Sequence, residues 1–203
     1  VRLRWSKKKV WSVLGIYSFW GFNSFGKFIR GFLLALGLIF ILLIILFVGS
    51  WVSWEGNLSL GSFINAIFLC LGVGLAEELI FRGWLWGELS LFLGPRLAII
   101  SQAVIFSLAH VHFGIGFVNL IALLLGLFLL GLVLALRRFL DEGLLAGCIG
   151  FHGGLVGIWF CLNSGLINIH TNTPLWVLGP RGMGSNPLGG VIAIFALGLI
   201  IWF

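Results

Sequence analysis

The sequence contains very little charge. Only 9% of its 203 residues are Asp, Glu, Lys or Arg, whereas 61% are hydrophobic. A soluble domain carries about 25% charged residues, so this composition excludes an ordinary soluble protein. Charge-free apolar runs long enough to cross a bilayer recur along the chain. We therefore expect an all-α, polytopic membrane protein folded as one helical bundle.

Cysteine is also scarce, and the familiar cysteine and zinc motifs are absent. Cys70, Cys148 and Cys161 each lie in an apolar run, and the sequence has no C-x-x-C and no H-E-x-x-H. We interpret the three cysteines as small buried hydrophobic residues. We find no internal repeat. The first long apolar run, from about residue 31, is longer than the hydrophobic part of a signal peptide.

Positive charge is concentrated at the beginning of the chain. The net charge is +6, and seven of the twelve basic residues precede position 31: Arg2, Arg4, Lys7, Lys8, Lys9, Lys27 and Arg30. Aromatic residues alternate with small residues in the same segment, a pattern typical of a membrane interface. We expect residues 1–30 to lie against anionic lipid headgroups and residues 31–203 to form the bundle, with no nucleic-acid partner.

Polar and charged residues divide the rest of the chain into six expected membrane spans. These cover about 31–49, 60–95, 97–112, 115–136, 143–162 and 187–203. The positive-inside rule places the N-terminus and the Arg137-Arg138 loop in the cytoplasm and residues 163–186 on the opposite side. Asn57-Leu58-Ser59 matches a glycosylation sequon, but we expect these residues to cap a helix.

The fifth span carries glycine at a helical spacing. Steps of 4, 3, 4 and 3 separate Gly143, Gly147, Gly150, Gly154 and Gly157. This spacing places all five on one stripe, which permits close packing against one neighbouring helix. The histidine of this span, at position 152, projects from roughly the opposite face.

Three charged side chains interrupt the second span within Ala76-Glu77-Glu78-Leu79-Ile80-Phe81-Arg82-Gly83. Each costs about 2.5–3.5 kcal/mol at the centre of a span on insertion scales, so their presence needs a reason. Glu78 and Arg82, at positions i and i+4, can form an ion pair. Glu77 lies about 100° around the helix from Glu78, which leaves its carboxylate available as a general base. A purely structural Glu–Arg pair that joins two helices explains these residues equally well.

Two histidines lie at similar depths in later spans. At 1.5 Å per residue, His110 is about 20 Å and His152 about 14 Å from the expected cytoplasmic edge. Two histidines, two carboxylates and one arginine on three spans favour a functional site over isolated hydrogen-bonding residues. Phe106 precedes His110 by one helical turn, where its ring could shield such a site. We assign His112 to the interface and His170 to the outer loop.

Three short motifs resemble those of the CPBP family of intramembrane proteases: Glu77-Glu78-x-x-x-Arg82, Phe106-x-x-x-His110 and His152. This family includes CAAX prenyl endopeptidases and proteins grouped as abortive-infection or bacteriocin-immunity proteins. The resemblance covers about residues 60–160. It implies a glutamate-dependent endopeptidase in an all-helical membrane bundle, with a cavity that opens toward the cytoplasm and the bilayer.

The resemblance also implies a role for each motif residue. Glu77 would be the base that activates water, and Glu78 with Arg82 would orient it. His110 would hold or polarise that water. His152 would help to stabilise the oxyanion that forms when water attacks the peptide carbonyl.

One position departs from the family pattern. The family usually has Asn or another polar residue four positions after the second histidine, where this sequence has Val156. Loss of one oxyanion donor costs about 10²–10³ in rate in a soluble protease. Asn163 lies too far along the helix to be a simple replacement. Either another group substitutes, or the enzyme is slow, or the protein is a non-catalytic relative.

Three alternatives stay open. Glu77, His110 and His152 could ligate zinc, although the resemblance implies a metal-free enzyme without a cofactor. A non-catalytic membrane scaffold or immunity-type protein would keep the polar cluster as internal glue, and Val156 favours this alternative. A small transporter could use the cluster as a proton relay, but no inverted repeat supports that function.

The partners expected of the enzyme are the lipid bilayer and a peptide or protein substrate, prenylated or not; the sequence indicates no oligomeric state.

Overall fold

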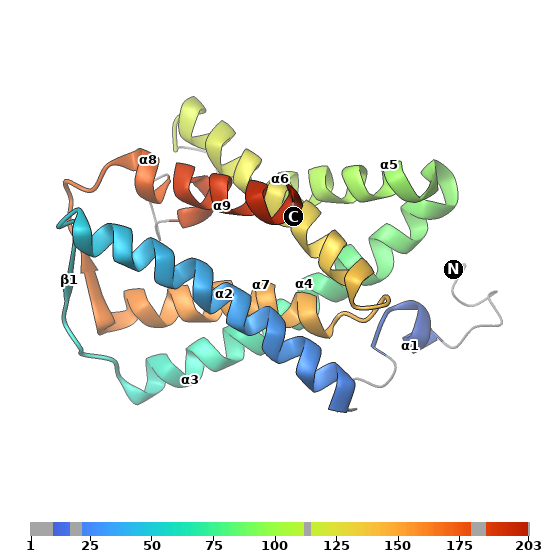
Figure 1. Ribbon diagram of the computed structural model, residues 1–203, viewed down its shortest axis with the longest axis horizontal. Coiled ribbons are helices and arrows are strands. Elements are labelled where there is room, and N and C mark those ends of the chain that lie inside the picture. The colour runs from blue at the N-terminus through green and yellow to red at the C-terminus, as the bar shows by residue number, and fades with distance from the viewer. Residues whose placement is uncertain (1–9, 17–21, 112–114, 180–185, 203) are drawn as a thin grey trace.

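The computed structural model describes residues 10–16, 22–111, 115–179 and 186–202, and it shows helices that run back and forth along one long axis (Figure 1). The all-α prediction is confirmed. The α-helices described outside the segment from 60 to 109 are α1 (Val10–Val13), α2 (Phe22–Val48), α6 (Phe117–Leu140), α7 (Ala146–Cys161), α8 (Leu175–Leu178) and α9 (Val191–Trp202), and the shorter helical turns there are η4 (Leu162–Leu166) and η5 (Pro187–Gly189). The basic residues 2–9 and His112 lie outside the described residues.

The segment from 60 to 109, called the rod below although it is bent at Gly94, is helical and contains two π-helical segments. It comprises α3 (Leu60–Phe68), η2 (Leu69–Val73), α4 (Gly74–Glu78), η3 (Leu79–Leu85) and α5 (Trp86–Ala109). The hydroxyl of Ser59 accepts a hydrogen bond from the Ser62 amide and caps α3, as predicted. The π-helical turns lie immediately before and after the five residues of α4, and such turns are frequent at functional sites.

Gly94 divides this rod into two segments. Its backbone has φ 76° and ψ 166°, a conformation that glycine adopts without a Cβ clash. Pro95 follows, and its missing N–H would leave a gap in a continuous helical hydrogen-bond ladder. The chain therefore turns at this point, and the two segments run in different directions (Figure 1). This break agrees with the predicted boundary between the second and third apolar runs.

The described helices fit a membrane protein. Four are long and apolar enough to cross a bilayer: Asn23–Val48, Leu60–Ala109, Phe117–Leu140 and Ala146–Leu166. Many large hydrophobic side chains face outward from them. Helix α9 is apolar but shorter. The break at Gly94 turns the longest helix into two segments, and the expected total of six spans stays a prediction.

Helix α7 lies between α2 on one side and the α3–α4 rod on the other. A Cβ on Gly150 would overlap the Phe28 carbonyl of α2, whereas a Cβ on Gly157 would lie 2.7 Å from the Ala66 carbonyl of α3. The prediction that the glycine stripe faces one neighbour was wrong, because α7 is approached closely from two sides. Gly143 is not part of this contact surface, since it precedes the helix.

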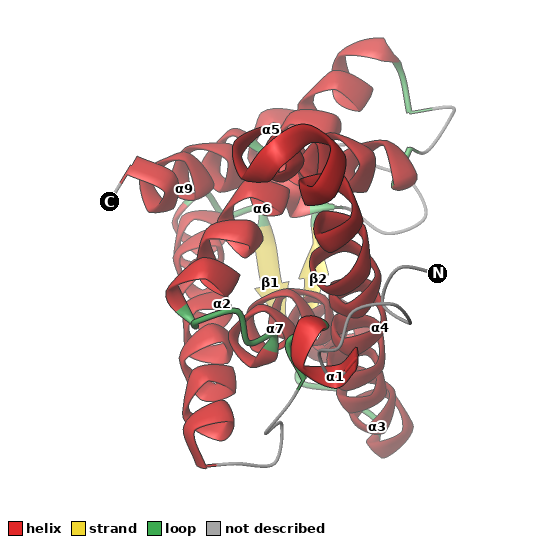
Figure 2. Cartoon of the chain, turned by 90° about the vertical axis from the view of Figure 1, so that its right-hand side faces the viewer, coloured by secondary structure: helices red, strands yellow, loops and turns green. Residues whose placement is uncertain are grey.

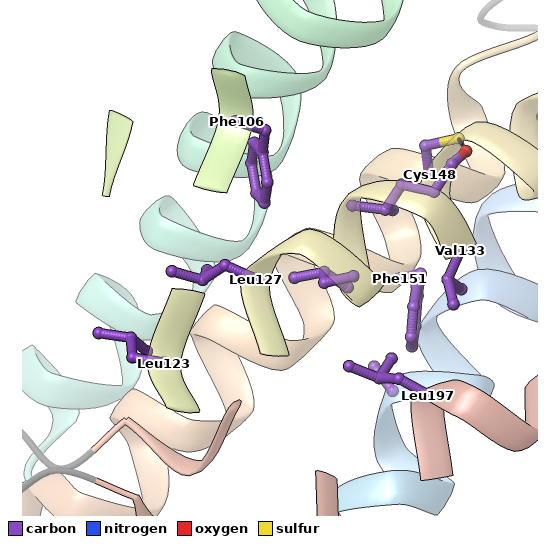
Figure 3. Packing of buried hydrophobic residues seen from close by; sticks show 10 residues of the cluster. Phe106, Leu123, Leu127, Val133, Cys148, Phe151 and Leu197 are labelled. Atoms are coloured by element: carbon purple, nitrogen blue, oxygen red, sulfur yellow. Dashed lines mark hydrogen bonds between the residues drawn. The ribbon is translucent and has the colours of Figure 1, made fainter. Parts of the chain in front are cut away.

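The apolar core lies where α6 meets α2, α5, α7 and α9 (Figure 3). Its buried members include Phe106, Leu123, Leu127, Val133, Cys148, Phe151 and Leu197. Cys148 is fully buried, which agrees with its interpretation as a small hydrophobic residue. Lipid tails are as apolar as these side chains, so close van der Waals packing rather than the hydrophobic effect holds such a core together.

The two ends of the bundle are closed differently. At one end, strands β1 (Val52–Trp54) and β2 (Ile167–Ile169) pair antiparallel and join the end of α2 to the end of α7 (Figure 2). At the other end, Arg137 donates two hydrogen bonds to the buried Asp141 carboxylate. Lys27 donates to the Asp141 backbone carbonyl. The bond from Lys27 connects α2 to the turn between α6 and α7, and the bonds from Arg137 hold that turn on α6.

Candidate active site

The centre of the candidate site is a fully buried ion pair. Nη1 of Arg82 donates to Oε1 of Glu78 at 2.9 Å, and neither side chain is exposed. This is the pair expected from the i, i+4 spacing. Removing one partner from such a pair typically costs about 3–5 kcal/mol, because the other charge is left buried and uncompensated.

His152 brings α7 to the same carboxylate. Its Nδ1 lies 2.8 Å from Oε1 of Glu78, and only 5% of the side chain is exposed. A carboxylate that already binds Arg82 acts as the acceptor, so Nδ1 of His152 carries the hydrogen. Nε2 of His152 then faces away from Glu78, toward Glu77.

Glu77 meets the histidine at the end of α5. Oε2 of Glu77 lies 3.2 Å from Nε2 of His110, and about a quarter of each side chain is exposed. Nδ1 of His110 lies 2.8 Å from the Phe106 carbonyl, which can only accept, so Nδ1 donates. Nε2 of His152 is 3.9 Å from the same Glu77 oxygen. The side chains of three helical segments therefore converge on one carboxylate oxygen.

Residues 59–158, which contain all of these side chains, match the family described as Type II CAAX prenyl endopeptidase Rce1-like. This central segment of the chain is therefore similar to that protease family. The resemblance drawn from the sequence motifs is thereby confirmed at the level of the family, and with the apolar helices it identifies an integral membrane protein. Neither a curated protein nor a solved structure matches the chain.

One aromatic ring forms a wall of the candidate site. The Arg82 guanidinium lies 4.2 Å from the centre of the Phe106 ring, a cation–π contact. The rings of His110 and His152 lie 4.7 and 5.7 Å from the same centre. Phe106 therefore does more than shield the site, because it fixes the spacing of three polar side chains. Phe81 packs edge-on against it at 5.0 Å.

Two other residues of the site were not predicted. Phe81 lies inside the charged motif but reads as one more apolar residue. Gln102 is fully buried in α5, and it precedes Phe106 by four residues, as Phe106 precedes His110. This i, i+4 series of polar, aromatic and polar residues on one helical stripe is the signal that could have identified Gln102.

The structure also has an apolar side chain at the place where the sequence departs from the family pattern. Val156 is half-buried in α7, one turn beyond His152. Asn163 is exposed in η4 (Leu162–Leu166), and its amide donates to the Trp159 carbonyl. It does not take the place of the missing polar side chain. His170 lies at the strand end of the bundle, where its Nδ1 contacts the Ser50 carbonyl, so it is not part of the site.

A metal centre is not formed by this arrangement as it stands. Within the described residues, no group of three or more His, Cys, Asp or Glu side chains has the geometry to hold a metal ion. Oε2 of Glu77, the oxygen nearest both histidines, is buried and has no well-aligned hydrogen-bond donor among those residues. The pairing of Glu78 with Arg82 and His152 leaves Glu77 as the carboxylate that can still bind another molecule.

Proposed function

We propose that this protein is an intramembrane endopeptidase in which Glu77 activates the water that hydrolyses a peptide bond near the membrane surface. One observation carries the proposal: three hydrogen-bond acceptor atoms converge. They are Oε2 of Glu77 and, in the neutral rings, the Nε2 atoms of His110 and His152, whose Nδ1 atoms both donate elsewhere. Such a set is stabilised by a molecule that brings hydrogens, and water does so.

The reaction follows from this geometry. As the water oxygen bonds to the scissile carbonyl carbon, Glu77 takes one of the water protons, and the carbonyl electrons move onto oxygen. In the imidazolium form, which the Glu78 carboxylate stabilises, Nε2 of His152 carries a hydrogen and donates it to that oxyanion. The carbonyl then re-forms, the C–N bond breaks, and its electron pair stays on nitrogen. Nitrogen takes the proton from Glu77, which leaves a new carboxyl group and a new amine.

Differences in burial and pairing support Glu77 rather than Glu78 as the base. Glu78 is completely buried and binds both Arg82 and His152, so its role is to hold those two side chains. About a quarter of the Glu77 side chain is exposed, which permits contact with water and substrate. Nε2 of His110, beside the same Glu77 oxygen, accepts a hydrogen bond from the attacking water and so holds and polarises it.

The substrate is a peptide or protein that reaches the site at the membrane, prenylated or not. The name of the family refers to prenylated CAAX proteins, and a membrane-anchored substrate of this kind suits a site within a helical bundle.

We propose that the end of the bundle formed by α1 and the turn after α6 is cytoplasmic. Arg138 of α6 donates to the Val13 carbonyl, which places these two segments at one end, and the basic residues favour the cytoplasm.

The test is cleavage of membrane-proximal and prenylated peptides by the purified protein in liposomes, with products identified by mass spectrometry. Glu77→Gln keeps the shape of the side chain and removes the base, so we expect cleavage to fall by about 10²–10⁴-fold. Glu55→Gln is the matched control, because it removes an exposed carboxylate near the strands at the other end of the bundle. Equal cleavage by Glu77→Gln and Glu55→Gln would refute the proposal.

A second candidate is a membrane scaffold that retains the polar cluster without hydrolysis, and the apolar side chain of Val156 favours it. The two functions differ in what Glu77 does. In a scaffold, Glu77→Gln lowers the melting temperature markedly and no peptide is cleaved by the wild type. In the enzyme, a partly exposed Glu77 contributes little to stability, and its replacement affects cleavage alone.

A further inference from the structure

Gln102 is a buried polar residue to which the proposed reaction gives no role. Its side chain is fully buried in α5. Its amide nitrogen donates to the Ile99 carbonyl of the same helix and, at 3.1 Å, to the Gly131 carbonyl of α6. A neutral amide at this depth is costly unless its hydrogen bonds are made, and these two bonds satisfy the nitrogen but leave the amide oxygen without a partner among the described residues.

The Gly131 carbonyl is shared with the candidate site. Nη2 of Arg82 lies 3.5 Å from this oxygen, while Nη1 binds Glu78. The absence of a side chain at Gly131 permits the approach, since a Cβ there would lie 2.9 Å from Cα and Cβ of Ala103. Gln102 and Arg82 thus reach the same acceptor from two helical segments.

The unpaired atoms of the structure point to the same connection. Within the described residues, every buried side-chain nitrogen or oxygen without a hydrogen-bond partner belongs to Glu77, Glu78, Arg82 or Gln102. Nε of Arg82 is a donor and Oε1 of Gln102 is an acceptor. The two groups are complementary, and both side chains are already joined to Gly131.

We propose that Gln102 is a positioning residue that fixes the Arg82 guanidinium, and through it the Glu78 carboxylate and the His152 ring. Its amide nitrogen holds the Gly131 carbonyl in place for Arg82, and its amide oxygen faces the Nε–H of Arg82, directly or through one water molecule. As a catalytic assignment it rests on the proposed endopeptidase function. The structural part of the inference, that Gln102 fixes the position of His152, does not depend on that function.

The test compares Gln102→Leu with Ser107→Ala. Ser107 is the matched control because it is also buried in α5 and donates to an α6 carbonyl, that of Leu124 at 2.7 Å, but does not touch Arg82. Both variants lose one such α5–α6 link. We expect kcat of Gln102→Leu to fall by about 10–100-fold, the range found for residues that orient metal ligands through a hydrogen bond, with KM unchanged. Ser107→Ala keeps both constants.

A measurement that needs no substrate tests this inference independently of the proposed endopeptidase function. In protein labelled with ¹⁵N-histidine, the Nδ1 resonance of His152 reports its hydrogen bond to Glu78. We expect the resonance to move in Gln102→Leu and to stay in place in Ser107→Ala. If both variants leave it unmoved, Gln102 only packs and the proposal is overturned. This holds whether or not the wild type cleaves a peptide.

Gln102→Glu provides a second variant in case the leucine substitution prevents folding. It has the same shape, and its carboxylate can pair with Arg82, but it cannot donate to the Gly131 carbonyl while ionised. We expect a folded protein in which the new carboxylate competes with Glu78 for Arg82, with a displaced His152 resonance and a kcat reduced at least tenfold. A wild-type resonance and wild-type kcat in this variant would overturn the proposal.

Discussion

Gly74→Ala tests how closely the glutamate helix must approach α7. Gly74 is helical, with φ −54° and ψ −46°, so alanine fits its backbone. The added Cβ, however, would lie 2.9 Å from the Ile149 carbonyl and 3.0 Å from Cα of Gly153, where ordinary contacts begin at 3.4 Å. Both obstacles are backbone atoms, so α4 and α7 must separate by about 0.5 Å. His152 and Glu78, 2.8 Å apart across this contact, separate with them.

Gly74→Ala is expected to lower stability because it overpacks the contact between α4 and α7, and to lower kcat because it displaces the residues of the site. Forcing an extra carbon into a tight helix contact costs about 1–3 kcal/mol. A 1 Å misplacement in a catalytic site can cost about 10²-fold in rate, so half of that displacement is expected to cost about tenfold. The matched control is Gly72→Ala in the same rod, because a Cβ there has no neighbour within 4 Å. Alanine at that position should stabilise the helix by about 0.5–1 kcal/mol.

The assay is thermal unfolding in detergent together with peptide cleavage. We expect Gly74→Ala to lower both the melting temperature and kcat, and Gly72→Ala to raise the melting temperature slightly without changing kcat. Equal melting temperatures for the two variants would refute the close contact between α4 and α7. A lower melting temperature with an unchanged kcat would refute the dependence of the site on that contact.

Three further predictions concern the oxyanion, a buried acid and the topology. Val156→Asn places a polar side chain one turn from the second histidine, and we expect kcat to rise by up to about 10²–10³-fold; an unchanged kcat would contradict a missing oxyanion donor at this position. Burial raises the pKa of the Asp141 carboxyl despite its hydrogen bonds from Arg137. The folded state therefore binds the proton more tightly than the unfolded state, and stability falls as the pH rises from about 3.9 through the folded pKa. Melting temperatures measured across pH 3–7 should show this fall in the wild type and not in Asp141→Asn, and equal slopes would contradict the assignment. In a background without the native cysteines, a cysteine replacing Glu142 should react with an impermeant maleimide from the cytoplasmic side and one replacing Asn172 from the opposite side; labelling from the same side would contradict the topology.

Much of the fold follows from local patterns in the sequence. Low charge and long apolar runs indicate membrane helices, and the Gly94-Pro95 pair indicates where one helix ends. Other features depend on packing between segments distant in the sequence. The two π-helical turns beside α4 have no sequence pattern of their own. The glycines of α7 divide between two neighbours, a result that depends on how the helices are arranged rather than on their spacing.

The candidate site is predictable to a similar degree. The spacing of Glu78 and Arg82 predicts their ion pair, because both lie on one helix. The sequence could not show that His152 binds Glu78 and His110 contacts Glu77, since this depends on the rotation of three helical segments about their axes. The i, i+4 spacing from Phe106 places Gln102 on the stripe of the site, but its partner could not be predicted, because the Gly131 backbone carbonyl belongs to a distant segment.

The central claim is that Glu77, and not a metal ion, activates the water. The most direct measurement is peptide cleavage by the wild type and by Glu77→Gln, each with and without a chelator. The account predicts wild-type cleavage that is unaffected by the chelator and at least about 10²-fold slower cleavage by Glu77→Gln, with both proteins folded. Cleavage that survives in Glu77→Gln, or that the chelator abolishes and zinc restores, would contradict it.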